Sequence, residues 1–303
     1  MVASVRSKKD SVVLTDPRTH RRPQAAVRAS SSFSRMLGLV DLFTEQEPAR
    51  TIDSLIATTG YKRATLYRYV RELCKVGLLV KLSASVYALG PRFIEIDRQI
   101  RASDPLLRIG QPVVADLFVT SGHTVILCSL LRDSVMCIHL QRANDVPAEL
   151  GHDRGRALPL FRSASAKAIL VGLPAARLRR LYQTFHAEIR SVGLGRDWET
   201  FKEHLRAIRR AGYAESRGEL VAGLVGLAVP VFSPDGEVLA SLAFVIPESQ
   251  LDAPRREFLV GILGRGADRM RMELGRLGAA PHNADESATA MGRRSRRNAR
   301  AAA

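Results

Sequence analysis

The segment TIDSLIATTGYKRATLYRYVRELCKVGLLVKLSASV, residues 51–86, predicts two short helices around a glycine turn, followed by two short strands. Thr51 suits the N-cap of the first helix, because its hydroxyl accepts a hydrogen bond from an otherwise unpaired backbone N–H group. Gly60 suits the turn, since glycine adopts a left-handed backbone at little cost. We expect the second helix over residues 62–75 and the two strands, which would form a wing, over 78–81 and 86–89. An apolar pattern from Phe33 to about Glu45 predicts a further helix before this segment.

The predicted second helix has one apolar face and one basic face. The apolar residues recur at helical spacing; they are Leu66, Tyr69, Val70 and Leu73. The opposite face carries Arg63, Tyr67, Arg68, Arg71 and Lys75. A helix–turn–helix needs this division, because one side docks on the protein core while the other enters the major groove of DNA. A solvated basic surface helix is the alternative, and the order of turn, apolar face and wing favours DNA binding over it.

Several side chains in this segment are candidates for DNA contact. An arginine can hold guanine or a phosphate with two hydrogen bonds, and the sequence does not divide these two roles. Small residues at the predicted wing turn would let the backbone approach a phosphate or the minor groove. The candidates are Thr51, Arg63, Thr65, Tyr67, Arg68, Arg71, Lys75 and Lys81.

The net charge of +16 over 303 residues is unevenly distributed. Residues 1–32 hold seven basic and two acidic residues, and residues 279–303 hold five and two. Residues 102–278, by contrast, are nearly balanced, with twenty-three basic and nineteen acidic residues. Positive charge on the two ends and on the predicted second helix (62–75) favours a polyanion partner that binds with salt-sensitive affinity.

The remaining composition bounds the class of protein. Three cysteines and seven histidines show no metal-ligand spacing, so we expect no metal or cofactor and interpret the cysteines as buried reduced thiols. No apolar run is long enough for a membrane span, and no apolar core follows the basic N-terminus as a secretory signal requires. A cytoplasmic protein without membrane contact is expected.

After residue 122 the helical spacing of apolar residues gives way to short runs rich in valine, isoleucine and leucine. Apolar runs at 124–131 and 134–140 predict a hairpin, and the turn sequence SPDG at 233–236 joins two further predicted strands. A loop is expected over 143–157. Helices are expected over 163–172, 174–185, 197–211 (capped by Asp197) and 252–277, and this arrangement indicates an α+β domain on an antiparallel sheet. We therefore divide the chain into a disordered basic arm (1–32), a winged helix–turn–helix (33–90), a linker helix (91–104), an effector-binding domain (105–277) and a disordered basic tail (278–303).

Over about residues 33–277 the chain resembles the isocitrate-lyase-regulator (IclR) family of bacterial transcription factors. In the first half the resemblance rests on residues 51–57, Gly60 with 63–70, 77–78 and 87–90. In the second half it rests on the motifs TSGHTVIL (120–127), PLFRSASAKAIL (159–170), GYA (212–214) and ELVAGLVGLAVPVF (219–232). It implies a winged helix–turn–helix joined by a helix to a GAF/PAS-like effector domain. It also implies a homodimer or tetramer that binds a small molecule and a roughly palindromic operator in double-stranded DNA.

The resemblance further implies an effector pocket between the sheet and the segment 163–167. Its wall would include Phe161, Ala164, Ser165, Ser216, Gly226, Ala243 and Val245. Relatives that bind small acids commonly have cysteine or serine at the position of Gly226, and serines at those of Ala243 and Val245. These changes remove polar groups from the wall, so we expect an apolar or aromatic effector rather than a compact keto acid. Lys167 suits an acidic ligand, although a helix-surface or packing role is the favoured reading.

Two other function classes are compatible with the sequence. GAF-like domains sometimes carry catalytic thiols, but Cys128 and Cys137 lie in apolar strand patterns without a Cys/His or Ser/His/Asp arrangement, so no enzyme is expected. A non-specific DNA-binding protein, driven by the basic ends, is the stronger alternative. The favoured function is a ligand-responsive regulator of catabolic genes for a small organic compound. Effector binding would shift the two DNA-binding domains of a dimer through the linker helix.

Overall fold

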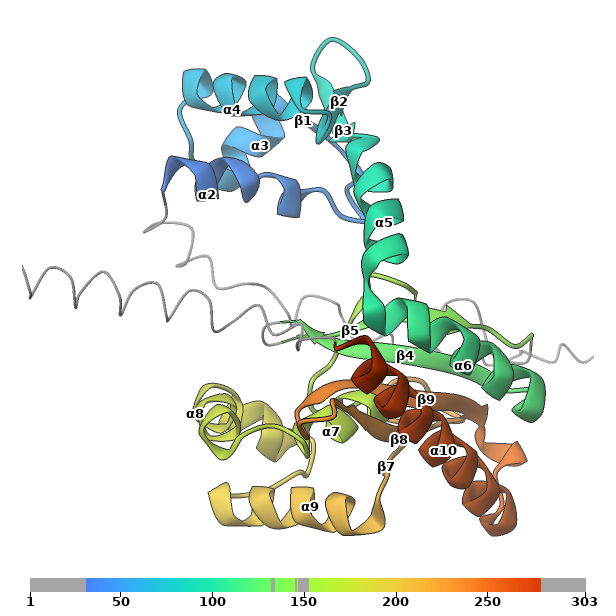
Figure 1. Cartoon of the computed structure of the whole chain (residues 1–303). Helices are drawn as coiled ribbons and strands as arrows, with labels where there is room; N and C mark the ends of the chain where they lie inside the picture. Colours follow the sequence, from blue (N-terminus) through green and yellow to red (C-terminus); the bar gives the residue numbers. More distant parts are fainter. Residues whose placement is uncertain (1–30, 132–133, 145, 147–152, 279–303) are drawn as a thin grey trace, which may run out of the picture. The chain divides into compact units, whose positions relative to one another are not determined.

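The computed structural model describes residues 31–131, 134–144, 146 and 153–278 (Figure 1). Those residues form two compact units, one ending at Asp104 and the other beginning at Pro105. The basic arm and the basic tail expected from the sequence lie outside the described residues, apart from Ser31, Ser32 and Gly278 at their edges.

The first unit has the element order of a winged helix–turn–helix. Its elements are α2 (Ser32–Leu37), the 3₁₀ turn η2 (Val40–Leu42), β1 (Ala49–Thr51), α3 (Ile52–Thr59), α4 (Arg63–Lys75), β2 (Leu79–Lys81), β3 (Val86–Leu89) and α5 (Arg92–Ser103). β3 lies between β1 and β2 in an antiparallel sheet. The two wing strands therefore match the sequence prediction to within one residue, whereas β1 was not predicted.

The chain turns between α3 and α4 at Gly60, whose φ of 69° is left-handed. The Thr51 hydroxyl accepts a hydrogen bond from the Ser54 N–H at 3.1 Å and so caps α3. The apolar face of α4 packs into a core with α3 and η2, in which Leu55 and Leu66 are fully buried.

One helix of this unit differs from the prediction. A single helix was expected from Phe33 to about Glu45, but α2 ends at Leu37 and only the short η2 turn follows. Gly38 lies at the break between the two elements. A glycine inside a continuous helix would destabilise it by about 0.5–1 kcal/mol relative to alanine, which favours ending the helix here. The apolar pattern itself is retained, because Leu39 and Phe43 are buried in the same core.

The second unit is built on one six-stranded sheet. Its elements are α6 (Pro105–Ser121), β4 (Thr124–Leu131), β5 (Ser134–Gln141), β6 (Ala157–Leu158), α7 (Ala164–Leu170), α8 (Ala175–Ser191), α9 (Trp198–Ala211), β7 (Ala214–Arg217), β8 (Leu224–Phe232), β9 (Val238–Pro247), η4 (Glu248–Gln250) and α10 (Ala253–Leu277). The strand order is β6-β5-β4-β9-β8-β7, and each neighbouring pair is antiparallel. The predicted antiparallel sheet is thus confirmed.

Helices cover both faces of this sheet (Figure 1). Alternate residues of the central strands point to opposite sides, as the period of two requires. Val125 and Leu127 of β4 pack in the core beneath α6 and α10, whereas Ile126 and Cys128 face the core that contains α7. α8 and α9 close that second core through aromatic side chains, and α7 lies directly on β7, β8 and β9.

Two details of this unit differ from the sequence prediction. α8 was expected to end at about Phe185, but it continues to Ser191 with a kink at Phe185, whose φ is −119°. The segment 143–157 was expected to be a loop, yet its last residue begins the short strand β6. Within the part of the chain that the structure describes, no helix is both long and apolar enough to cross a membrane.

Candidate functional sites: a basic groove and an effector cavity

The exposed face of α4 forms one wall of a groove of about 550 Å³, and the wing forms the other. α4 contributes Ala64, Tyr67, Arg68, Val70, Arg71 and Cys74, and the wing contributes Lys81 and Tyr87. Tyr67, Arg68, Arg71 and Lys81 are exposed, so four of the predicted DNA contacts share one surface. Such a surface offers bidentate donors to bases together with cations for phosphates.

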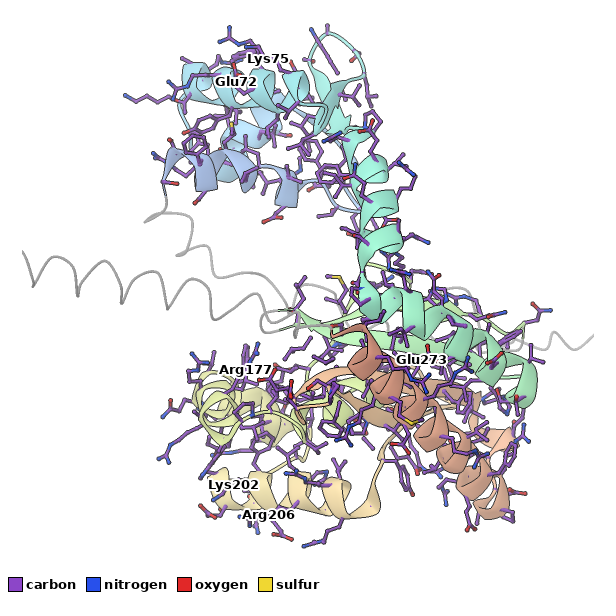
Figure 2. The ribbon with its side chains drawn as sticks, viewed as in Figure 1. Glu72, Lys75, Arg177, Lys202, Arg206 and Glu273 are labelled. Atoms are coloured by element: carbon purple, nitrogen blue, oxygen red, sulfur yellow. The ribbon has the colours of Figure 1, made fainter. Side chains whose placement is uncertain are left out.

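Arg63 and Lys75, at the two ends of α4, are already paired with carboxylates of this chain. Arg63 donates to Asp53 of α3, and this hydrogen bond raises the pKa of the guanidinium. Lys75 donates to Glu72 at 3.0 Å, which lowers the pKa of that carboxyl, and Figure 2 shows the two side by side on α4. Both pairs are exposed, and such pairs contribute little to stability, so a DNA phosphate can compete for either cation.

The other predicted contacts lie nearer the core. Thr51 uses its hydroxyl oxygen as the cap of α3, and Thr65 is half-buried on α4. A capped helix start still presents backbone N–H groups and the positive end of the helix dipole to an anion. Thr51 and Thr65 therefore stay predictions as DNA contacts, as do the six basic and aromatic residues.

The second site is a small cavity between α7, the β7–β8 loop and the sheet. Its lining residues are Ile126, Ser163, Ala164, Ser165, Ser216, Glu219, Leu220, Val221, Leu224, Val225, Gly226, Ala243, Phe244 and Val245. Six of the seven predicted effector residues are therefore brought together around it. Phe161 is not in the lining; it is fully buried and packs instead against Phe185 and Phe201, with ring centroids 5.8 and 6.4 Å apart.

The cavity wall is less apolar than the family resemblance implied. Aliphatic side chains make its floor, but three serines and Glu219 also line it. Ser163 caps α7 by accepting the Ala166 N–H at 3.0 Å, and Ser216 accepts the Ala164 N–H at 3.3 Å. The polar groups missing at Gly226, Ala243 and Val245 are thus offset by others, which come from α7 and β7.

Gly226 has a specific steric role in this wall. It pairs with Ser216 across β7 and β8, and a Cβ atom at Gly226 would lie 2.8 Å from the Ser216 Oγ and 3.1 Å from the Ala164 Cβ. The Ser216 hydroxyl therefore occupies the space that a larger side chain at 226 would need. Serine at 216 and glycine at 226 are sterically matched.

We predict that Gly226→Ala destabilises the protein by about 1 kcal/mol, the low end of overpacking costs, because the small hydroxyl can turn aside. Ser216→Ala in the same chain removes the closest contact, so the double variant should lose less stability than the two single variants together. Urea unfolding of the four proteins measures this coupling. Strictly additive losses would contradict the proposed steric match.

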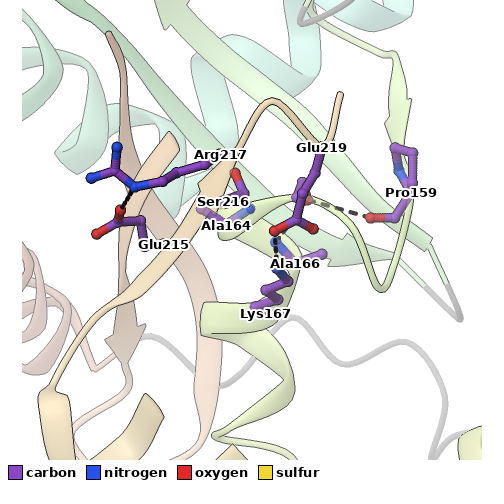
Figure 3. A network of polar contacts seen from close by, with 9 residues as sticks. Pro159, Ala164, Ala166, Lys167, Glu215, Ser216, Arg217 and Glu219 are labelled. Atoms are coloured by element: carbon purple, nitrogen blue, oxygen red, sulfur yellow. Dashed lines mark hydrogen bonds and ion pairs between the residues drawn. The ribbon is translucent and has the colours of Figure 1, made fainter. Parts of the chain in front are cut away.

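A buried ion pair lies beside the cavity. The Lys167 side chain on α7 is only 7% exposed, and its Nζ lies 2.5 Å from Oε1 of Glu219, which is 30% exposed (Figure 3). His204 of α9 is influenced by both charges: burial and the Lys167 cation lower the pKa of its imidazole, and Glu219 partly opposes them. Lys167 is therefore neither on the helix surface nor simply packed, since it holds a carboxylate.

The described residues contain no group of three or more histidine, cysteine, aspartate or glutamate side chains placed to hold a metal ion. Cys128 and Cys137 are directly opposite each other on β4 and β5, and both are buried. The hydrogen bond between these thiols and their burial raise the pKa of Cys128 well above its ordinary value, which disfavours a thiolate nucleophile.

Sequence reasoning missed Glu219 and the aliphatic residues after it as parts of the cavity wall. They lie between Gly218 and Gly223, whose φ values of 61° and 78° are left-handed, in the loop that joins β7 and β8. The signal in the sequence was a lone acidic residue followed by Leu220 and Val221, bounded by two glycines. Nothing local in that pattern indicates a partner 52 residues away.

Comparison with known proteins relates the chain to one family. A family model described as "Bacterial transcriptional regulator IclR C-terminal" matches residues 100–271. The HTH-type transcriptional regulator KipR of Bacillus subtilis is 25% identical over 228 residues, which cover 74% of this chain and 89% of KipR.

Solved structures show the same fold. An IclR transcriptional regulator from Alicyclobacillus acidocaldarius aligns with a TM-score of 0.64 at 22% identity, covering 84% of this chain and 100% of that one. An IclR homologue from Microbacterium hydrocarbonoxydans, complexed with 4-hydroxybenzoate, aligns with a TM-score of 0.65 at 23% identity, covering 81% of this chain and 100% of that one.

Proposed function

The chain belongs to the IclR family of bacterial transcriptional regulators, and on that premise we propose how it works. α4 reads operator DNA, and the cavity beneath α7 senses a small organic compound. Residues 33–90 serve as the reading head, 91–104 as the linker helix and 105–277 as the effector-binding domain. Two copies of the chain place two heads on the half-sites of a roughly palindromic operator.

The basic groove between α4 and the wing carries the DNA-binding part of the proposal. Arg68, Arg71 and Lys81 are exposed around it, while the apolar face of α4 is buried against the rest of the head. This is the arrangement that lets a recognition helix enter the major groove without disturbing its own core. The alternative of a non-specific DNA-binding protein predicts no dependence on base sequence.

A mobility-shift experiment separates these alternatives. The full chain is mixed with the intergenic DNA upstream of its own coding sequence and an excess of random competitor DNA. A regulator gives a shift that survives the competitor, and a non-specific protein gives one that the competitor and added salt remove equally from every fragment. Absence of any shift would refute the DNA-binding role.

The cavity supports an aromatic or apolar effector that carries a polar end. Ile126, Ala243 and Val245 form an aliphatic wall, while the serines and Glu219 provide a polar edge. The complex of the Microbacterium hydrocarbonoxydans relative with 4-hydroxybenzoate is an example of such a ligand in that protein. The proposed targets are genes for the breakdown of the compound sensed.

Calorimetry with a panel of acids tests the effector class. We expect the full chain to bind benzoate or 4-hydroxybenzoate more tightly than glyoxylate or pyruvate, because the compact keto acids leave the aliphatic wall unfilled. Tight binding of glyoxylate or pyruvate without binding of aromatic acids would refute this part of the proposal and leave the DNA-binding part intact.

A further inference from the structure

We propose that Glu219 is an internal stand-in for the effector, and that an organic monocarboxylate opens the cavity by replacing the Glu219 carboxylate on Lys167. The inference rests on the proposed function, namely that this cavity binds the effector. It adds the chemical class of the ligand, the residue that anchors its charge and the residue that it must displace.

Lys167 needs a permanent counter-charge. Every residue of α7 is buried, and the Lys167 side chain is only 7% exposed. An isolated ammonium in such a place is strongly unfavourable unless an opposite charge and hydrogen bonds compensate it. Glu219 supplies that charge at 2.5 Å (Figure 3).

Glu219 comes from an element whose backbone is suited to movement. It lies in the loop between β7 and β8, bounded by Gly218 and Gly223, both with left-handed φ. Glycines at the two ends of a loop absorb backbone rotation at little cost. The Glu219 side chain is also 30% exposed, whereas that of Lys167 is 7% exposed. If the pair separates, the Glu219 carboxylate can therefore be hydrated more easily than the Lys167 ammonium.

The cavity is too small for an effector unless part of its wall moves. The space inside it is about 30 Å³, whereas a single water needs roughly 10–15 Å³ on the same measure. An aromatic ring does not fit without displacing part of the wall. Glu219, Leu220 and Val221 are the lining residues that belong to the loop rather than to the sheet or α7.

The need of the buried Lys167 ammonium for a counter-charge then selects the ligand. When the loop withdraws to admit a ligand, Lys167 loses Glu219 and its ammonium is left buried without a counter-ion. A carboxylate ligand restores the pair, so the exchange is balanced, whereas a neutral ligand of the same shape leaves the cost unpaid. The pair thereby makes the cavity selective for an anion, although its walls are mostly aliphatic.

Competition by Glu219 also weakens the apparent affinity. The observed dissociation constant equals the intrinsic one divided by the fraction of molecules in which the site is open. If Lys167 is unpaired in about one molecule in ten, removing the competitor strengthens binding about tenfold. Glu219 therefore sets the effector concentration at which the protein responds.

The test compares Glu219→Gln with the wild type in the full chain, using benzoate and its uncharged analogue benzamide as probes. Glutamine keeps a carbonyl oxygen near Lys167 but removes the competing charge. We expect the variant to bind benzoate at least about tenfold more tightly in calorimetry, with benzamide binding unchanged. The gain should vanish in the Lys167→Met/Glu219→Gln double variant, which contains no unpaired buried charge.

Two controls make the result decisive. Glu248→Gln removes a carboxylate from an exposed pair with Arg217 outside the cavity lining and should leave benzoate binding unchanged. The pKa of His204, followed by NMR without ligand, should fall further in Glu219→Gln, because the carboxylate that opposes its lowering is gone. That shift shows that the variant is folded around the same cluster.

The proposal is overturned if Glu219→Gln binds benzoate no more tightly than the wild type, including the case in which neither protein binds it. It is also overturned if the gain persists in the double variant. Wild-type binding of benzoate and benzamide with equal affinity, unaffected by either change, would leave the aromatic-effector proposal standing and remove only the role of Glu219 and Lys167.

Discussion

Replacing Arg68 with alanine lowers the affinity of the protein for its operator by about 1–3 kcal/mol, or roughly 5- to 150-fold, if this side chain reads a base. Arg68 is exposed in the groove between α4 and the wing, and its guanidinium lies 5.6 Å from the centre of the Tyr69 ring. Fluorescence anisotropy with labelled operator DNA measures the loss.

The matched control removes the same charge from the other unit. Arg180 lies exposed on α8, so Arg180→Ala should leave operator affinity nearly unchanged. An equal loss for operator and random DNA in Arg68→Ala would assign Arg68 to a phosphate instead of a base. Unchanged operator affinity, with the fold intact, would remove Arg68 from the interface.

Replacing Phe201 with alanine should lower the free energy of unfolding by about 3–5 kcal/mol, the usual cost of emptying a buried aromatic site. Phe201 is fully buried on α9, and its ring centroid lies 5.7 Å from that of Tyr182 and 6.1 Å from that of Trp198. This aromatic cluster also holds Phe161, just before α7. Urea unfolding checks the loss of stability.

Phe258→Ala is the matched control, because Phe258 belongs to the same unit but is 43% exposed. Its removal should cost well under the loss at Phe201. We also expect effector binding to weaken in Phe201→Ala, since the cluster supports α7 from the side opposite the sheet. A loss below about 1 kcal/mol at Phe201 would contradict the packing described.

Local signals account for most of the fold that could be predicted. The left-handed Gly60, the turn at 233–236 and the cap at Asp197 each act within a few residues, and each falls where the prediction placed it. The nearly continuous apolar runs of β4 and β9 are also local signals, and they match the burial of these strands on both faces of the sheet.

The strands that were missed are determined by distant partners. β1 consists of three residues that read as the approach to α3, and they become a strand because β3 lies beside them. β6 has two residues and pairs with β5. Short segments of this kind have little intrinsic preference, and tertiary contacts decide their state.

The effector cavity shows the same limit. Positions on β7, β8, β9 and α7 were predicted from family resemblance, and the structure places six of them on one wall. Phe161 lies outside this lining, and its ring packs against Phe185 of α8 and Phe201 of α9. The Lys167–Glu219 pair joins residues 52 positions apart, and only the paired register of β7 and β8 brings that loop over α7.

The most direct test of the central claim is the ratio of two affinities at one salt concentration. One is for the protein's own upstream intergenic DNA, and the other is for a shuffled fragment of identical composition, both measured by anisotropy with the full chain. A regulator that reads sequence through α4 should prefer its own site by about 10³-fold or more. A ratio near one, with equally steep salt dependence for both fragments, would contradict the account.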